Sequence, residues 1–276
     1  MIVLSLFDGM SCGYEALKRA GIYVEKYYSS EIDKYAIQVA QKNHPDIIQL
    51  GDINGWEDWD IEKPDLIIGG SPCQGFSFAG KQLAFDDPRS KLFFTMMDII
   101  EYYRPEHKLL ENVKMKKEHL DVITQYMDVD PHFINSALVS AQNRQRFYWY
   151  NWSAPDPDDK GVLLEDIIED GFVEKDKSWA LLESYSRFPK KTESAKGRYK
   201  RSMMPIIFKT SNYSFDDGWR ELSVKEMERL QTLQDGYTNS VSEVKAKSML
   251  GNGWTVNVIA HLFKHLPLND FERLIR

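Results

Sequence analysis

The sequence predicts an α/β protein that is built on a parallel sheet and carries a small inserted domain in its second half. Up to Tyr150, short apolar runs alternate with segments of helical spacing, which is the pattern of βαβ units. Several of these runs end in glycine or an acidic residue, as strands do at the ligand-binding edge of an open α/β sheet. From Asn151, an acidic stretch and then a basic stretch interrupt this pattern until helical spacing resumes near Ser223.

The composition is that of a globular protein with one large domain, or one domain plus an insert. The 276 residues are 42% hydrophobic and 28% charged, and the net charge is -7. That charge argues against a generic nucleic-acid binder, although the distribution of charge matters more. No apolar run reaches the length of about 18 residues that spans a bilayer, and no signal peptide precedes the first strand, so we expect no membrane partner. Because Cys12 and Cys73 lie in separate turns, we expect no disulfide framework and a cytoplasmic location.

The first predicted strand, 2–7, is followed by a glycine-rich turn, 8–13. Helical spacing then runs from Tyr14 to Ala20, with Gly21 as the C-cap. Such a turn presents backbone N–H groups at a helix N-terminus to a ligand. Because it lacks the G-x-G-x-x-G pattern, no diphosphate cofactor is implied. A tight turn that merely needs small residues is the other interpretation.

Acidic residues follow the next two predicted strands, 23–30 and 47–50. Glu31 stands where nucleoside-binding α/β folds hold the ribose hydroxyls. Asp52 could accept a hydrogen bond from an adenine amino group. For Glu31, an acid that complements a helix dipole is the alternative. Together, the turn and the two acids predict a nucleoside pocket without a phosphate site.

A cysteine follows the fourth predicted strand, 65–69, within Gly70-Ser71-Pro72-Cys73-Gln74. Open α/β sheets place reacting groups just beyond the carboxyl ends of their strands. Pro72 fixes a backbone dihedral next to the sulfur. A Pro-Gly turn that happens to hold a buried thiol suits the motif alone equally well.

The remaining elements of the first part carry polar residues at their ends. A helix over 89–103 precedes a fifth strand, 108–110, which delivers Glu111 and Asn112. Further strands are predicted over 132–140 and 147–150. In an extended segment, Arg144 and Arg146 would face the same side, whereas two solvated surface arginines are the alternative.

We interpret 152–219 as a small inserted domain, so that 1–151 and 220–276 form the main domain. Within the insert, 187–201 is basic, and Tyr185, Phe188 and Tyr199 are expected to pack rather than stay in solvent. A solvated surface loop is the alternative for the charges. After the insert, Ser223 and Glu226 have the spacing of a capping box.

The motifs, taken in order, resemble those of the DNA cytosine-5 methyltransferases. The series is Phe7-Asp8-Gly9, Glu31, Gly51-Asp52-Ile53, Pro72-Cys73-Gln74, Glu111-Asn112-Val113, Gln142-x-Arg144-x-Arg146, Arg220-Glu221-Leu222-Ser223 and Gly251-Asn252. The resemblance implies a Rossmann-like S-adenosylmethionine-dependent methyltransferase sheet, with 152–219 as the target-recognition domain. The two ends of the chain resemble eukaryotic de novo enzymes, and the loop 74–82 resembles bacterial restriction-modification enzymes. This mixture suggests a microbial or phage-encoded enzyme, and Asn252 is the bacterial choice where the de novo enzymes usually carry arginine.

The resemblance also implies a reaction and a set of residues. A methyl group would pass from S-adenosylmethionine to C5 of a cytosine flipped out of double-stranded DNA. Cys73 would add to C6 and Glu111 would hold and protonate N3, while Asn112 would hold the Pro72–Cys73 loop. Arg146 would contact the base O2, and Arg144 would support the pocket. The implied cofactor residues are Phe7, Asp8, Gly9, Met10, Glu31, Ile32, Asp52, Ile53, Pro72, Leu92, Asn252 and Trp254. The DNA-binding residues that we expect are Gln74, Ser77, Lys81, Arg187, Lys190, Lys191, Arg198 and Lys200, and no metal is expected.

Two other functions stay open at this point. A tRNA-modifying branch resembles the family closely, and a basic insert with aromatic residues suits RNA as well. A catalytically inactive DNA-binding homologue is the third possibility, although such proteins usually lose the cysteine or the glutamate, and Cys73 and Glu111 are both present. Monomer and homodimer are both compatible with the sequence.

Overall fold

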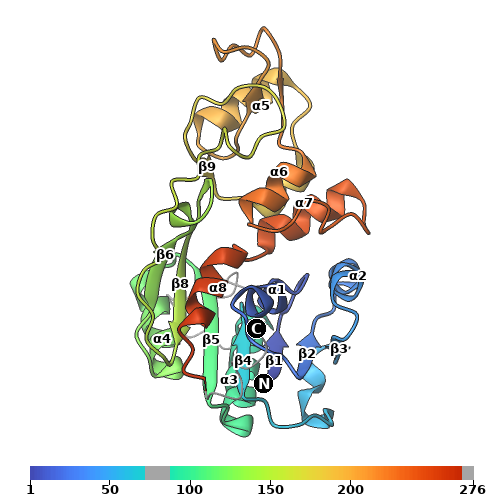
Figure 1. Ribbon diagram of the computed structural model, residues 1–276, viewed down its shortest axis with the longest axis vertical. Coiled ribbons are helices and arrows are strands. Elements are labelled where there is room, and N and C mark those ends of the chain that lie inside the picture. Colours follow the sequence, from blue (N-terminus) through green and yellow to red (C-terminus); the bar gives the residue numbers. More distant parts are fainter. Residues whose placement is uncertain (72–87, 269–276) are drawn as a thin grey trace. The chain divides into compact units, whose positions relative to one another are not determined.

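A computed structural model describes residues 1–71 and 88–268 of the chain, which is drawn in Figure 1. The chain divides into two compact units. Unit 1 comprises Met1–Ile134, Gln145–Pro155 and Ala260–Arg276, and unit 2 comprises Asn135–Arg144 and Asp156–Ile259. In these described ranges, none of the helices combines the length and the apolar composition needed to cross a membrane.

The large sheet has seven strands in the order β3-β2-β1-β4-β5-β8-β6 (Figure 1). In that order, the strands are β3 (Ile48–Gln49), β2 (Lys26–Ser30), β1 (Ile2–Leu6), β4 (Leu66–Gly69), β5 (His107–Val113), β8 (Gln145–Tyr150) and β6 (His132–Asn135). β1 to β5 pair in parallel, whereas β8 pairs antiparallel with β5. The order reverses beside β1, where β2 and β3 extend to one side and β4 and β5 to the other. This doubly wound arrangement confirms the predicted fold class, and its ligand edge is the edge of the strand carboxyl ends.

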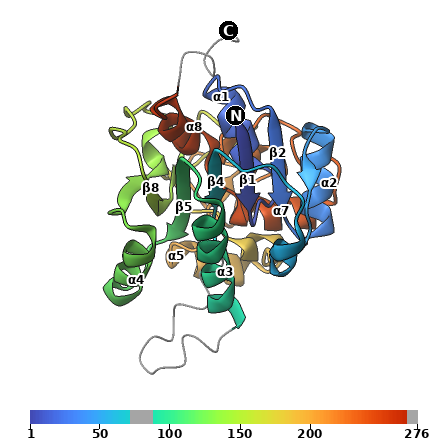
Figure 2. The same ribbon diagram turned by 90° about the horizontal axis from the view of Figure 1, so that it is seen from below.

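Helices cover both faces of this sheet. They are α1 (Cys12–Arg19), α2 (Lys34–Asn43), α3 (Pro88–Tyr103) and α4 (Lys117–Met127), together with the 3-10 helix η1 (Ile53–Asp58). Figure 2 shows α3 and α4 on one face and α1 on the other. The core under α3 and α4 joins Leu4, Ile67 and Leu110 of the strands to Phe93 and Met96 of α3, and none of these side chains is exposed. Because the central strands are buried on both faces, they consist of apolar runs, which is why the sequence revealed them.

Two strand boundaries differ from the prediction. β5 continues to Val113 instead of ending at Leu110, because β8 pairs with it along 109–113. Glu111 and Asn112 are therefore part of the strand. The predicted strand 132–140 ends at Asn135, whose side chain accepts a hydrogen bond from the Ala137 N–H and starts the 3-10 helix η3 (Ser136–Leu138).

Unit 2 has short strands and several helices. They are β7 (Gln142–Asn143), β9 (Ser178–Trp179), β10 (Ile207–Phe208), β11 (Trp219–Arg220), η4 (Glu183–Arg187), α5 (Thr192–Lys200), α6 (Val224–Leu230) and α7 (Glu243–Asn252), and α8 (Val256–Lys264) leads from unit 2 into unit 1. Phe188 and Tyr199 pack against a small core of Ala195, Ile206 and Phe208, and Tyr185 is buried. The expectation that the aromatic residues near the basic stretch pack is confirmed. Unit 2 is larger than the predicted insert 152–219, and the extent of a target-recognition domain within it stays a prediction.

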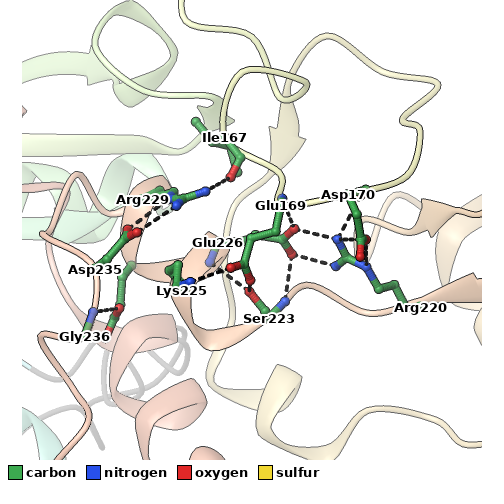
Figure 3. Close-up of polar contacts among 11 residues, drawn as sticks. Ile167, Glu169, Asp170, Arg220, Ser223, Lys225, Glu226, Arg229, Asp235 and Gly236 are labelled. Carbon is green, nitrogen blue, oxygen red and sulfur yellow. Dashed lines mark hydrogen bonds and ion pairs between the residues drawn. The ribbon is translucent and has the colours of Figure 1, made fainter.

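Ion pairs hold the start of α6 in unit 2, as Figure 3 shows. The buried Glu226 accepts hydrogen bonds from the Ser223 N–H at 2.8 Å and from Arg220, while the Ser223 hydroxyl accepts from the Glu226 N–H. The predicted capping box is thus confirmed. Arg220 also donates from Nε to Asp170 Oδ1 at 2.7 Å, so it ties α6 to the acidic stretch.

Candidate active site

The turn after β1 has an unusual backbone. Phe7, Gly9 and Ser11 have φ angles of 56°, 59° and 61°. Residues other than glycine rarely adopt this left-handed conformation, and where they do, the strain often accompanies a functional site. A Cβ atom added at Gly9 would meet no atom within 4 Å, so this part of the turn is open.

Asp8 supports this turn from within unit 1. Its carboxylate accepts hydrogen bonds from the hydroxyl groups of Ser5, Ser11, Tyr27 and Ser29. Burial raises the pKa of the Asp8 carboxyl above its usual value, and the four hydroxyl donors oppose that rise. These contacts explain how the strained turn is kept in place.

Glu31 joins the ends of β1 and β2. Its Oε2 accepts the Gly9 N–H at 2.7 Å, and its Oε1 accepts the N–H groups of Ile32 and Asp33, both at 2.8 Å. The cap of α2 is instead Asp33, which accepts the Tyr35 N–H. Glu31 therefore shapes the turn, and an ionised carboxylate has further acceptor positions for a ligand.

Asp52 follows β3 at the same edge of the sheet. Its side chain is exposed, and Oδ1 accepts the Asn54 N–H at 2.9 Å, which caps η1. The Ser30 hydroxyl donates to the Gly51 carbonyl at 2.9 Å and so fixes the end of β3 to the end of β2. Because β1, β2 and β3 are neighbours, the turn, Glu31 and Asp52 line one stretch of the edge.

The apolar residues predicted for the cofactor differ in exposure. Met10 and Ile53 are buried, whereas Phe7 and Leu92 are half-buried and pack against the core. Ile32 is 74% exposed beside Glu31. The open backbone at Gly9, the two carboxylates and this exposed side chain fit a nucleoside, whose hydroxyls and amine donate hydrogen bonds, better than a phosphate, which the carboxylates would repel.

β5 positions a second group of polar residues. Asn112 is buried and donates from Nδ2 to the carbonyl and the hydroxyl of Ser71, at 3.3 and 3.4 Å. Ser71 follows β4, the neighbour of β5, and directly precedes Pro72. Asn112 thus fixes the last described residue before the cysteine motif. Pro72, Cys73, Gln74, Ser77 and Lys81 lie outside the described residues.

Glu111 is held by Arg146 from β8. Arg146 Nε lies 2.8 Å from Glu111 Oε1, and the two side chains are only 13% and 11% exposed. Arg146 is paired with Val113 in the antiparallel register, and Glu111 is two residues before Val113, so the two side chains meet diagonally on one face. The two groups form an ion pair by distance, but Arg146 Nε has no hydrogen-bond partner among the described residues, so the attraction is electrostatic and not a directed hydrogen bond.

Arg144 has entirely different surroundings. It is 3% exposed and lies between β7 and β8, outside both strands. Its guanidinium donates to the carbonyl groups of Leu181 and Gly253, both at 2.9 Å, and of Gly251 at 3.3 Å. All of these partners belong to unit 2, whereas Arg146 contacts Glu111 in unit 1. That the two arginines face the same side stays a prediction, whereas the alternative of two solvated surface arginines is wrong, because Arg144 is buried and the Arg146 side chain is only 13% exposed.

The basic stretch 187–201 is partly neutralised within unit 2. Arg187 pairs with Glu183 at 2.9 Å, and Arg198 makes a long hydrogen bond, 3.5 Å, to the Arg187 carbonyl. Lys190, Lys191 and Lys200 are exposed, and they form no ion pair with another residue of the described part of the chain. These three lysines keep their charge available for a polyanion.

The chain matches the family description "C-5 cytosine-specific DNA methylase" over residues 1–153 and 168–267. It belongs to this family. Named type II methyltransferases are among its relatives. One relative is the type II methyltransferase M1.ScrFI of Lactococcus lactis subsp. cremoris, which is 30% identical over an alignment of 297 positions, gaps included. The alignment covers 91% of this chain and 74% of the relative. Another is the type II methyltransferase M.NlaX of Neisseria lactamica, 29% identical, with 93% of each chain covered.

Solved structures share the fold of this family member. A mutant of DNMT2 from Spodoptera frugiperda superposes with a TM-score of 0.70 and 20% identity, covering 96% of this chain and 99% of that one. A putative DNA modification methyltransferase from an E. coli prophage gives a TM-score of 0.64 and 20% identity, covering 96% and 98%. At such identities the likeness supports the fold alone.

Proposed function

We propose that the chain transfers a methyl group from S-adenosylmethionine to C5 of a cytosine in double-stranded DNA, through a covalent adduct with Cys73. The observation that carries this proposal is that two adjacent residues of β5 contact two different parts of the proposed site. Asn112 holds Ser71, two residues before the cysteine, and the adjacent Glu111 is held by Arg146. One strand thereby fixes a carboxyl group and the residue that precedes the cysteine motif.

The chemistry that these residues perform follows from the low reactivity of cytosine C5. The Cys73 thiolate adds to C6, and the displaced electron pair moves toward N3, where Glu111 donates a proton. S-adenosylmethionine, when bound, would supply an electrophilic methyl group to the activated C5, with its sulfur leaving as a neutral thioether. Loss of the C5 proton to a base, departure of the thiolate and return of the N3 proton to Glu111 restore the neutral aromatic ring. Arg146 forms an ion pair with Glu111 and, by the family resemblance, contacts the base O2.

For the cofactor, we assign Glu31 to the ribose hydroxyls and Asp52 to the adenine amine, with Phe7 and Ile32 against the purine. Asn252 and Trp254 complete this set by the family resemblance. The neighbouring strand ends of β1, β2 and β3 support the first four assignments. DNA and the cofactor meet this protein in the microbial cytoplasm, as we infer from the bacterial and phage relatives.

A methylation assay tests this function directly. The purified chain is incubated with S-adenosylmethionine that carries a labelled methyl group, and with either duplex DNA or tRNA. Digestion to nucleosides and mass spectrometry should find 5-methyldeoxycytidine in the DNA reaction. Label in tRNA alone would replace the proposal with the RNA alternative, and label in neither would refute both.

We expect Asp52→Ala to weaken S-adenosylmethionine binding. The variant loses a hydrogen bond to a charged acceptor, which corresponds to about 1–2 kcal/mol, or on the order of tenfold in Kd. Calorimetry measures the change. Asp33→Ala is the matched control, because Asp33 caps α2 as Asp52 caps η1 but has no proposed contact with the cofactor. Equal affinities for the two variants would move adenine away from Asp52.

Neutralising the exposed charge of the basic stretch should weaken DNA binding. We expect a variant with glutamine at Lys190, Lys191, Arg198 and Lys200 to bind DNA more weakly. The slope of log affinity against log salt concentration should become shallower by about one unit for each phosphate contact removed. A control that neutralises the exposed Lys18, Lys42, Lys63 and Lys264 changes the net charge equally. Affinity is measured across a salt series. If both variants give the slope of the unaltered protein, 187–201 does not touch DNA.

A further inference from the structure

Arg144 contacts the C-terminal end of α7 and its cap residue, Gly253, in unit 2. We call these residues the Gly251–Gly253 turn. The Arg144 guanidinium donates to the carbonyl groups of Gly251 and Gly253, which flank Asn252, and also to that of Leu181. Gly253 directly precedes Trp254, so its carbonyl belongs to the peptide group that joins the two residues. The contacts therefore fix the backbone on both sides of Asn252 and immediately before Trp254.

A second buried side chain reaches the same turn. Gln231 is unexposed and donates from Nε2 to the carbonyl groups of Leu250 at 2.6 Å and Gly253 at 3.0 Å. Its Oε1 accepts hydrogen bonds from Gln142 and from the Thr255 hydroxyl, both at 3.0 Å. We call Gln142, Arg144, Gln231 and Thr255 the buried hub; each of them is at most 3% exposed.

The turn itself has no room to shift toward its neighbour. A Cβ atom on Gly251 would lie 2.3 Å from the Leu182 carbonyl carbon and 2.4 Å from the Glu183 nitrogen. Backbone packs on backbone here, so the position of the turn depends on the hub and on η4. Asn252 nevertheless stays exposed at the surface of unit 2, and Trp254 is half-buried.

We infer that Arg144 is a positioning residue for the cofactor rather than for the target base, an inference that rests on the proposed function. It acts through the Gly251–Gly253 turn, which presents Asn252 and Trp254. Only a planar guanidinium offers five donors in a fixed fork, whereas a lysine ammonium is a point charge that cannot reach the separate carbonyls in the same geometry. Arg144 and Arg146 thus serve different reactants, although one residue separates them.

The test compares cofactor affinity among three variants. Arg144→Lys should raise the Kd for S-adenosylmethionine on the order of tenfold, as expected from the loss of charged hydrogen bonds. Gln231→Met removes the second hold on the turn and should act in the same direction, by roughly threefold. It also keeps the inference testable should Arg144→Lys not fold. Lys177→Met is the matched control: Lys177 likewise donates to three carbonyl groups of unit 2, those of Ala137, Ser140 and Val162, far along the chain from the turn.

The KM for the cofactor and kcat, measured separately, distinguish a specific effect on cofactor binding from general destabilisation. Arg144→Lys should raise the KM for the cofactor and leave kcat at saturating cofactor within about twofold, whereas Arg146→Lys should lower kcat and leave that KM unchanged. Unaltered affinity in both Arg144→Lys and Gln231→Met would overturn the inference, as would an equal loss in Lys177→Met. An unaltered protein that binds no S-adenosylmethionine would instead refute the proposed function, and the inference with it.

Discussion

Replacement of Cys73 by serine is expected to abolish methyl transfer while cofactor binding persists. A serine hydroxyl is barely ionised at neutral pH, so it cannot add to C6 as a thiolate does. The rate should fall below detection in the labelled-methyl assay, and calorimetry should find the S-adenosylmethionine affinity of the unaltered protein. Turnover by Cys73→Ser would refute the covalent mechanism.

The other cysteine supplies the control. Cys12 is buried at the start of α1 and has no proposed role in the reaction, so Cys12→Ala should keep its turnover, with some loss of thermal stability. A DNA duplex with 5-fluorocytosine at the target provides independent support. Fluorine does not leave C5 as a proton does, so the unaltered protein and Cys12→Ala should form a covalent complex that survives denaturation, and Cys73→Ser should not.

Replacement of Glu111 by glutamine is expected to lower the methylation rate on the order of a hundredfold or more, the usual range for a general acid. Glutamine keeps the size of the side chain but cannot release a proton to N3. Binding of DNA and of cofactor should persist, because neither depends on that proton. Single-turnover kinetics separate the chemical step from binding, and an unchanged rate would show that another group protonates the base.

A buried glutamate elsewhere tests whether loss of an arginine pair alone explains the effect. Glu226 is unexposed and lies 2.7 Å from Arg220, much as Glu111 lies 2.8 Å from Arg146. Glu226→Gln should lower the melting temperature, because it removes the charge of a buried carboxylate that is paired with Arg220. Its methylation rate, measured below the melting transition, should stay within a few-fold of the unaltered protein. A loss as large as that of Glu111→Gln would remove the case for a specific role of Glu111.

The sequence revealed the fold because the central strands are buried on both faces and consist of apolar runs. It also placed Glu31 and Asp52 after adjacent strands, since parallel strands end at the same edge. It did not reveal that Glu111 and Asn112 lie inside β5, because the antiparallel partner that extends this strand comes much later in the chain. Pairing between distant segments decides such boundaries, and local patterns do not report it.

The surroundings of Arg144 could not be predicted from local sequence patterns for the same reason. An arginine beside a strand is most often solvated, yet this one is buried against carbonyl groups that lie 37 and 109 residues further along the chain. The only hint in the sequence was the pair of glycines around Asn252. Gly251 leaves space for the backbone of η4, and no local pattern names the partner segment.

The buried hub also imposes an order on the folding of the protein during its synthesis. Gly253 follows Arg144 by 109 residues, and ribosomes add about 5–20 residues per second, so Arg144 waits roughly 5–20 s for its last partner. Until those later residues are made, the Gln142 and Arg144 donors that pair with residues 230–253 stay hydrogen-bonded to water. Unit 2 therefore matures only after Gly253 has been added to the chain. A ribosome stalled before Gly251 would present chaperones and proteases with an unfinished unit, whatever the state of the strands made earlier.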